Sequence, residues 1–169
     1  EQNFESKKIL VEKPIFHKFI DYEVRKNLVF VGYNLRFNPL IQLIKNKISD
    51  RKVWNIYVYC GSYLPEWRPE RDYRSIYSSK QERGGGVLLD LSHELDYVSW
   101  LVGAITPTYV RSGKVSDLEI DSDDVLDLIG WTESGVHTQI ALNYFSRKAI
   151  RKILIDGEGI SIDADLIGR

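Results

Sequence analysis

Apolar residues recur along the chain at two spacings, one typical of helices and the other typical of strands. The helical spacing covers residues 39–48 and, more clearly, residues 88–101, which Gly103 follows as a natural stop. A weaker helix is predicted over residues 17–26. The stripe of the clearest helix is expected to consist of Leu88, Leu91, Leu95, Val98 and Val102.

Short apolar or alternating stretches predict the strands. Tight turns at 133–135 and 156–159 join the later strands, and this implies an antiparallel run. We therefore expect an α+β fold, with a mostly antiparallel open β-sheet that helices cover on one face only. The predicted strands are residues 8–12, 28–33, 53–59, 108–115, 125–132, 136–145 and 150–155.

Composition narrows the classes of function. Lys and Arg number 23, Asp and Glu number 24, and the formal net charge is −1, so no overall field favours nucleic acid or an anionic membrane. The single cysteine, Cys60, excludes an internal disulfide framework and is typical of a reducing compartment. No apolar stretch is long enough to span a membrane, and no Cys/His cluster has metal-ligand spacing. A cytoplasmic location without membrane contact is expected.

Three charged residues stand out on the clearest helix. Asp90, His93 and Asp96 are three positions apart, so both carboxylates can approach the imidazole. A carboxylate bonded to one ring nitrogen leaves the other free to take a proton, and His93 is therefore a candidate general base. The glycines at 84–86 would let a ligand approach the backbone. A capping or core histidine in an acidic, solvated helix face is the alternative.

Two further features have weaker signals. Lys13 follows an apolar strand and precedes Pro14, at a strand end of the kind where ligands gather in α/β folds. It could equally be a surface lysine in a turn. The loop at 63–77 combines aromatic rings, which suit sugars, with arginines, which suit carboxylate or phosphate. Its acidic residues argue against single-stranded nucleic acid, and the loop could instead only pack over the sheet.

Three sequence strings, in this order, resemble the glucose–fructose oxidoreductase, inositol dehydrogenase and rhizopine-catabolism (Gfo/Idh/MocA) family. They are residues 11–14 (VEKP), residues 31–39 (VGYNLRFNP) and residues 84–103 (GGGVLLDLSHELDYVSWLVG). The resemblance runs through nearly the whole chain. The glycine fingerprint that binds dinucleotide phosphates does not occur in it.

The resemblance implies a two-domain parent enzyme. Residues 1–33 would be the trailing edge of a Rossmann, dinucleotide-binding domain, and residues 34–169 an α+β substrate and oligomerisation domain, incomplete at its C-terminus. The cofactor would be NAD or NADP, and the substrate a sugar, cyclitol or sugar derivative that reacts by hydride transfer. This chain alone is expected to be inactive.

The resemblance also implies roles for individual residues. Lys13 resembles the lysine that polarises the reacting oxygen, and His93 the histidine that removes the hydroxyl proton. Asp90 resembles an aspartate that the family commonly places four residues before that histidine, where Leu89 stands here. The expected cofactor contacts are Glu12, Lys13, Pro14 and Arg36. The expected substrate contacts are Tyr63, Trp67, Arg68, Tyr73 and Asp96.

A different class of function stays open. A binding or assembly module could use the same sheet without redox chemistry, and it would need no phosphate-binding glycine turn upstream. In either case Trp131, Tyr144 and Phe145 are expected near a bare sheet face. Because large apolar patches rarely stay exposed, a homodimer or a higher assembly through the sheet is expected.

Overall fold

The structure is a computed structural model that describes residues 5–18, 20, 21 and 23–168. Its main feature is one six-stranded sheet with the strand order β4-β5-β6-β3-β7-β8. All neighbours are antiparallel except β3 and β6, which run parallel. The strands are β3 (Val53–Gly61), β4 (Ile105–Gly113), β5 (Val125–Thr132), β6 (His137–Asn143), β7 (Ile150–Gly157) and β8 (Ile160–Asp165).

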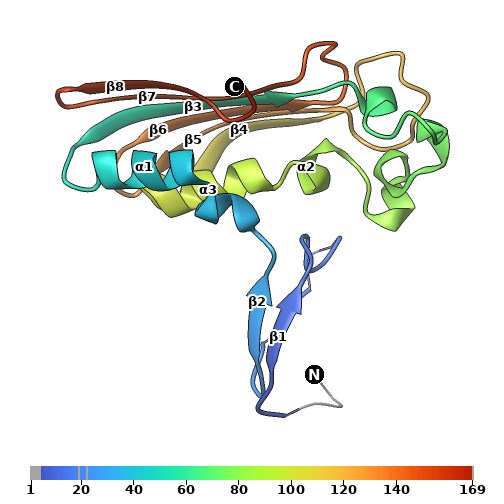
Figure 1. The fold of residues 1–169 in the computed structure, drawn as a ribbon, viewed down its shortest axis with the longest axis horizontal. Coiled ribbons are helices and arrows are strands. Elements are labelled where there is room, and N and C mark those ends of the chain that lie inside the picture. The colour runs from blue at the N-terminus through green and yellow to red at the C-terminus, as the bar shows by residue number, and fades with distance from the viewer. Residues whose placement is uncertain (1–4, 19, 22, 169) are drawn as a thin grey trace.

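Three helices lie on one face of this sheet (Figure 1). They are α1 (Pro39–Ile48), α2 (Val87–Asp90) and α3 (His93–Val102). Alternate residues of the strands point toward them and form the core, among them Ile56, Ile140 and Ile153, all at most 1% exposed. Within the part of the chain that the structure describes, the other face carries no α-helix, which confirms the expected α+β fold with a mostly antiparallel sheet covered on one side. Among the described residues no helix is both long and apolar enough to cross a bilayer.

Helix α1 forms where the spacing predicts it, because its start signal is local. Asn38 is the N-cap, and its side-chain oxygen accepts hydrogen bonds from the backbone N–H groups of Leu40 (2.9 Å) and Ile41 (3.4 Å). Pro39 occupies the first helical position, where a missing N–H costs nothing. Ile41 and Ile44 then face the sheet and are buried.

The prediction of one continuous helix over residues 88–101 is wrong in detail, because the helix is interrupted between Asp90 and His93. The start of α2 is set from outside: the backbone N–H of Leu88 donates to the side chain of Asp123 at 3.1 Å. The Ser92 hydroxyl then donates to the Leu89 carbonyl and closes the turn. The predicted stripe shifts as a result, since Leu88 is 37% exposed.

The helix predicted over residues 17–26 is also wrong. None of its described residues is helical, and positions 19 and 22 lie outside the described residues. Short helices take most of their stability from packing of an apolar face. Here Ile20 and Val24 are 50% and 40% exposed, so that packing is missing.

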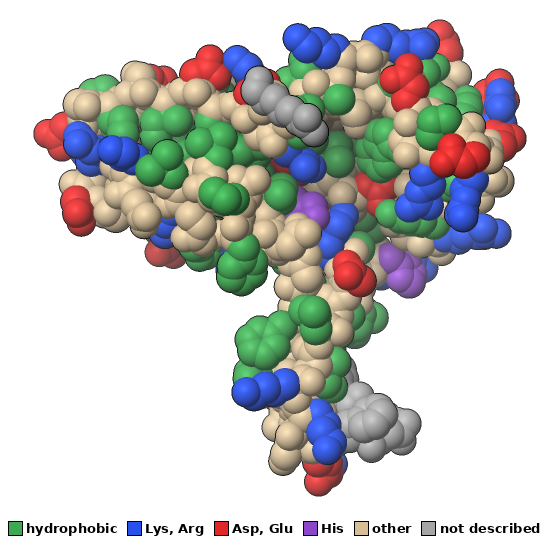
Figure 2. Space-filling model, in the orientation of Figure 1, with side chains coloured by type: hydrophobic (Ala, Val, Ile, Leu, Met, Phe, Trp, Pro, Cys, Tyr) green, Lys and Arg blue, Asp and Glu red, His purple; other side chains and the backbone are tan. Residues whose placement is uncertain are grey.

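A small ribbon projects from the helical side of the molecule (Figures 1 and 2). It consists of β1 (Lys8–Val11) and β2 (Leu28–Val31), which pair in parallel and form a separate two-stranded sheet. Leu10 is 75% exposed and Phe30 is 51% exposed. Parallel sheets are normally covered on both faces, and a two-stranded sheet is marginal alone. The ribbon therefore offers apolar surface to a further layer.

Gly85 is expected to be irreplaceable for stability, because it packs directly on backbone that lines the site described below. A Cβ there would lie 2.2 Å from the Tyr77 carbonyl oxygen and 2.5 Å from that of Ser78. Gly85→Ala should lower the free energy of unfolding by roughly 2 kcal/mol or more, measured by urea denaturation. Gly113→Ala is the matched control, since nothing lies within 4 Å of its Cβ position. Equal stability of the two variants would contradict this packing.

Candidate active site

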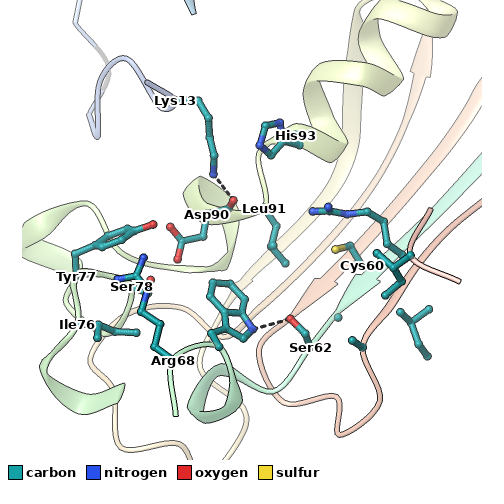
Figure 3. Close-up of a pocket in the computed structure, with 16 residues that line it drawn as sticks. Lys13, Cys60, Ser62, Arg68, Ile76, Tyr77, Ser78, Asp90, Leu91 and His93 are labelled. Atoms are coloured by element: carbon teal, nitrogen blue, oxygen red, sulfur yellow. Dashed lines mark hydrogen bonds between the residues drawn. The ribbon is translucent and has the colours of Figure 1, made fainter. Parts of the chain in front are cut away.

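A cleft of about 430 Å³ opens where α2 meets α3, beside the ends of β3 and β7. The loop that follows β3 forms its opposite wall (Figure 3). Lys13 reaches it from the turn after β1, and thus the ribbon and the sheet domain meet here. The lining residues are Lys13, Cys60, Gly61, Ser62, Trp67, Arg68, Ile76, Tyr77, Ser78, Asp90, Leu91, His93, Ala149, Ile150, Arg151 and Ile167.

The Lys13 ammonium is fixed at the end of α2. Its Nζ donates to the backbone carbonyl oxygen of Asp90 and, at 3.4 Å, to that of Leu89. These carbonyls belong to the helix end, where unsatisfied acceptors favour a cation. Burial lowers the pKa of Lys13, while the carboxylates of Asp90 and Glu94 oppose this shift. The peptide bond between Lys13 and Pro14 is cis.

His93 begins α3 and points toward Lys13 (Figure 3). Its Nδ1 atom is buried and has no hydrogen-bond partner among the described residues. The Tyr33 ring packs edge-on against the imidazole, with ring centroids 5.6 Å apart. Burial, together with the charges of Lys13 and Arg151, lowers the pKa of His93 to about 4. The imidazole is therefore neutral at physiological pH, with one buried ring nitrogen unpartnered.

The two carboxylates expected beside His93 are used elsewhere. Asp90 is buried and accepts a hydrogen bond of 2.7 Å from the Tyr144 hydroxyl. Asp96 accepts two hydrogen bonds from Arg36, at 2.8 Å to Nε and 2.5 Å to Nη2. Neither forms a hydrogen bond to the imidazole among the described residues, so the expected carboxylate–histidine pair is not present.

The cleft brings together five of the residues singled out from sequence: Lys13, Trp67, Arg68, Asp90 and His93. Trp67 is oriented by a 2.7 Å hydrogen bond from its Nε1 to the Ser62 hydroxyl and by an edge-on contact with Tyr144. A flat indole in the wall of a polar cleft is a suitable surface for a sugar ring.

The remaining predicted residues do not line this cleft. Tyr63 stacks under the Arg147 guanidinium, 3.6 Å from the ring centroid, and the Tyr73 hydroxyl accepts from the Glu119 backbone at 3.2 Å. Glu12 and Pro14 flank Lys13 outside the lining. The Arg36–Asp96 pair lies in a neighbouring, largely apolar hollow of about 740 Å³ along β2.

Sequence reasoning missed the polar residues beneath the cleft. Tyr144, expected near the bare face, is fully buried, because it follows β6 directly and continues the core-facing alternation of Ile140 and Leu142. Glu94 is also fully buried, and its Oε1 lies 2.7 Å from Nε of Arg151. No well-directed N–H···O hydrogen bond joins this pair, so close charge contact is what holds it. Alternation continued from β6 could have found Tyr144, and helical spacing could have found Glu94.

Cys60 lies beside the Glu94–Arg151 pair and is buried. Burial and the nearby Glu94 charge raise the pKa of the thiol to about 12. The nucleophilic thiolate is thus disfavoured, which is unlike the environment of a reactive cysteine. Among the described residues no group of three or more His, Cys, Asp or Glu side chains is placed to hold a metal ion.

Comparisons with known proteins agree on one family and fold. The sequence matches the profile of the GFO/IDH/MocA C-terminal domain over residues 41–163. No curated protein sequence matches significantly. The fold is similar to the WlbA dehydrogenase from Bordetella pertussis in complex with NADH and UDP-GlcNAcA, with a TM-score of 0.68 and 22% identity over 81% of this chain and 42% of that one.

Two other solved structures are similar over the same 81% of this chain. GenD2 from gentamicin A biosynthesis, in complex with NAD, has a TM-score of 0.68 at 18% identity, over 39% of its length. A myo-inositol dehydrogenase from Corynebacterium glutamicum has a TM-score of 0.64 at 19% identity, over 40% of its length. The chain thus spans about two fifths of these proteins.

The neutral state of His93 is directly measurable. NMR titration of the labelled imidazole should show protonation only as the pH falls to about 4, because burial and two neighbouring cations disfavour the charged form. Lys13→Met should raise the midpoint while keeping it below the ordinary value, since one cation is lost and burial remains. A wild-type midpoint near 6.5 would contradict the described environment.

The Tyr144–Asp90 hydrogen bond is expected to support the floor of the cleft. Tyr144→Phe removes the hydroxyl that donates to the buried Asp90 carboxylate. The variant should lose roughly 1.5–3 kcal/mol of unfolding free energy in chemical denaturation. Tyr109→Phe, at a 51% exposed ring on β4, should change stability by less than about 0.5 kcal/mol. Similar losses in both variants would rule out a specific role for this bond.

Proposed function

Because the chain belongs to the GFO/IDH/MocA family, whose C-terminal domain it contains, we propose that it is the substrate-side part of a nicotinamide-dependent oxidoreductase. The substrate is a sugar, cyclitol or sugar derivative, and the reaction is hydride transfer between an alcohol carbon and the cofactor. The observation that carries the proposal is the meeting of Lys13 and an uncharged His93 in one cleft.

The similar structures support this class of reaction. The WlbA structure holds NADH and UDP-GlcNAcA, and the GenD2 structure holds NAD. A third similar protein is a myo-inositol dehydrogenase. At these identities the likeness concerns the fold, so the substrate class for this chain rests on the cleft itself.

The residues present fit a nicotinamide group. Tyr33, which lines the largely apolar hollow along β2, packs against His93 of the cleft. The buried Nδ1 of His93 has no partner among the described residues. Glu12, Lys13 and Pro14 would hold the nicotinamide side, and Arg36 would border it through its pair with Asp96. When bound, the cofactor accepts or delivers the hydride, and NAD or NADP would serve equally for this step.

Lys13 and His93 would both contact the substrate hydroxyl, Lys13 as a hydrogen-bond donor and His93 as the proton acceptor. An ammonium has three donors, and two are directed at the carbonyls that end α2, which leaves one for the substrate oxygen. That contact stabilises negative charge as it develops on the oxygen. The neutral imidazole can take the hydroxyl proton as the hydride leaves the carbon. Asp90, fixed by Tyr144, would act as a positioning residue for Lys13 through the helix end.

The domain division is part of the proposal. Residues 1–33 would belong to the edge of a dinucleotide-binding domain, and residues 34–169 to the substrate and oligomerisation domain. The exposed apolar side chains of the ribbon support this, since a parallel pair needs cover. Trp131, at 49% exposure, and Tyr109 lie on the uncovered sheet face and support association of two copies there.

Turnover tests the proposed function. A longer form of the protein with upstream sequence should be screened with NAD and NADP against neutral sugars, cyclitols and nucleotide sugars, following the absorbance of the reduced nicotinamide. Turnover by the longer form, absent from the 169-residue chain, is the expected result. A folded longer form that binds the cofactor but turns over no substrate would instead favour a binding or assembly module.

Removal of the proposed base should slow chemistry without unfolding the protein. His93→Ala in the longer form is expected to lower kcat by about 10²–10⁴-fold, the usual contribution of a positioned general base. His17→Ala is the control, since His17 does not line the cleft. Circular dichroism checks the fold of both. Undiminished kcat in His93→Ala would remove His93 from the mechanism.

A further inference from the structure

The charges that line the cleft are unbalanced. Three cationic side chains lie in its wall, Lys13, Arg68 and Arg151, against a single carboxylate, that of Asp90. Lys13 and Asp90 already have their partners, since Lys13 donates to helix-end carbonyls and Asp90 accepts from Tyr144. Among the described residues the two arginines therefore have no carboxylate partner in the lining itself, and Glu94 contacts Arg151 from outside it.

Arg151 contributes a largely buried cation to this wall, and it stands on a strand of the sheet. It lies on β7 directly opposite Cys60 of β3, and its side chain is 22% exposed. It occupies the same core-facing side of β7 as Ile153 and Ile155, both fully buried. A charged residue at such a position is costly unless its charge is used.

Glu94 orients Arg151 without occupying its guanidinium. The carboxylate lies 2.7 Å from Nε, and neither of its oxygens forms a hydrogen bond with the guanidinium. A guanidinium has five N–H donors arranged as a fork, more than this one contact uses. Burial also raises the pKa of Glu94, and the charge of Arg151 opposes this shift. Burial therefore disfavours the ionised carboxylate that would neutralise Arg151.

Arg68 completes the pattern from the other wall. It comes from the loop after β3, and Figure 3 shows it across the cleft from Lys13. It is exposed, and its side chain forms no ion pair or hydrogen bond with the described residues. Arg74, on the same loop, differs because it is paired with Asp72 and Glu119.

We propose that the ligand of this cleft is an anionic sugar derivative, whose carboxylate or phosphate group is bound by Arg151 with help from Arg68. A guanidinium fork matches the two oxygens of either group. A neutral sugar would leave Arg68 without an anionic partner and Arg151 with the buried Glu94 alone. The inference rests on the proposed function for the sugar part of the ligand, and on the cleft geometry for its charge.

The anionic group would bind close to the reacting hydroxyl. Arg151 and His93 line the same cleft, and the Arg151 charge contributes to the low pKa of His93. An anion on Arg151 offsets that charge. Binding of an anionic sugar should therefore raise the pKa of His93, and a neutral sugar should not, which gives a readout independent of turnover.

The test is a binding measurement on the 169-residue chain at constant ionic strength. D-glucuronate, D-glucose 6-phosphate and D-glucose are compared by titration of the His93 imidazole signal, with acetate and inorganic phosphate as sugar-free anions. At least one anionic sugar should bind ten-fold or more tighter than glucose, and which one does so identifies carboxylate or phosphate. Equal affinity for glucose, or equal affinity for the sugar-free anions, would overturn the proposal.

Variants locate the binding group. Arg68→Met and the double variant Glu94→Gln/Arg151→Met should each weaken binding of the anionic sugar by about ten- to a hundred-fold, the range of a charge-assisted hydrogen bond. The double variant removes both charges of the buried pair and leaves no lone buried charge. Arg71→Met, on the same loop but outside the cleft lining, is the matched control.

Unchanged affinity in Arg68→Met and in a folded double variant would overturn the assignment. The two proposals fail separately. Selective binding of an anionic sugar without any turnover in the longer form would reject the oxidoreductase and keep the anion site. Turnover of neutral sugars alone would keep the oxidoreductase and reject the anion site.

Discussion

The contact between Lys13 and the end of α2 is the constraint on which the site depends. It joins the projecting ribbon to the sheet domain, and it places an ammonium beside His93. The carbonyls at a helix end are natural acceptors for a cation, so a short helix of four residues is enough to hold it. The same helix end is held from below by Asp90 and Tyr144.

Burying the charged residues Glu94 and Arg151 under the cleft costs desolvation free energy. A role in function explains this cost better than a contribution to stability does. Glu94 and Arg151 form an ion pair in which the carboxylate is fully buried, and such pairs are weak evidence for stability. A functional role explains the pair: Arg151 would bind an anion, and Glu94 would orient Arg151. The charge of Arg151 also helps to keep His93 neutral, and a proton acceptor must be neutral.

Features with local causes could be predicted from sequence. Helix α1 was predicted over residues 39–48, where it lies, because its cap and its apolar stripe are adjacent in the chain. The tight turns and the mostly antiparallel sheet followed from glycine positions and alternation. The meeting of Lys13 and His93 in one cleft agrees with the resemblance to the family, although their roles stay predictions.

Features with distant causes could not be predicted in the same way. The start of α2 depends on Asp123, which comes from a loop beyond β4. The described residues of 17–26 are not helical, and Ile20 and Val24 stay 50% and 40% exposed, so no buried apolar face supports a helix there. Glu94 and Arg151 were different, since alternation and helical spacing place both on core-facing sides. A charged residue at a core-facing position is a signal in the sequence that indicates a buried polar site.

The central claim is that this cleft serves hydride transfer, and isotope transfer tests it most directly. A substrate that carries deuterium on the carbon of the reacting hydroxyl would be oxidised by the longer form of the protein, and the reduced cofactor would be analysed by mass spectrometry and NMR. The account predicts that the deuterium appears on the nicotinamide ring. Deuterium released to water, with none on the ring, would contradict it.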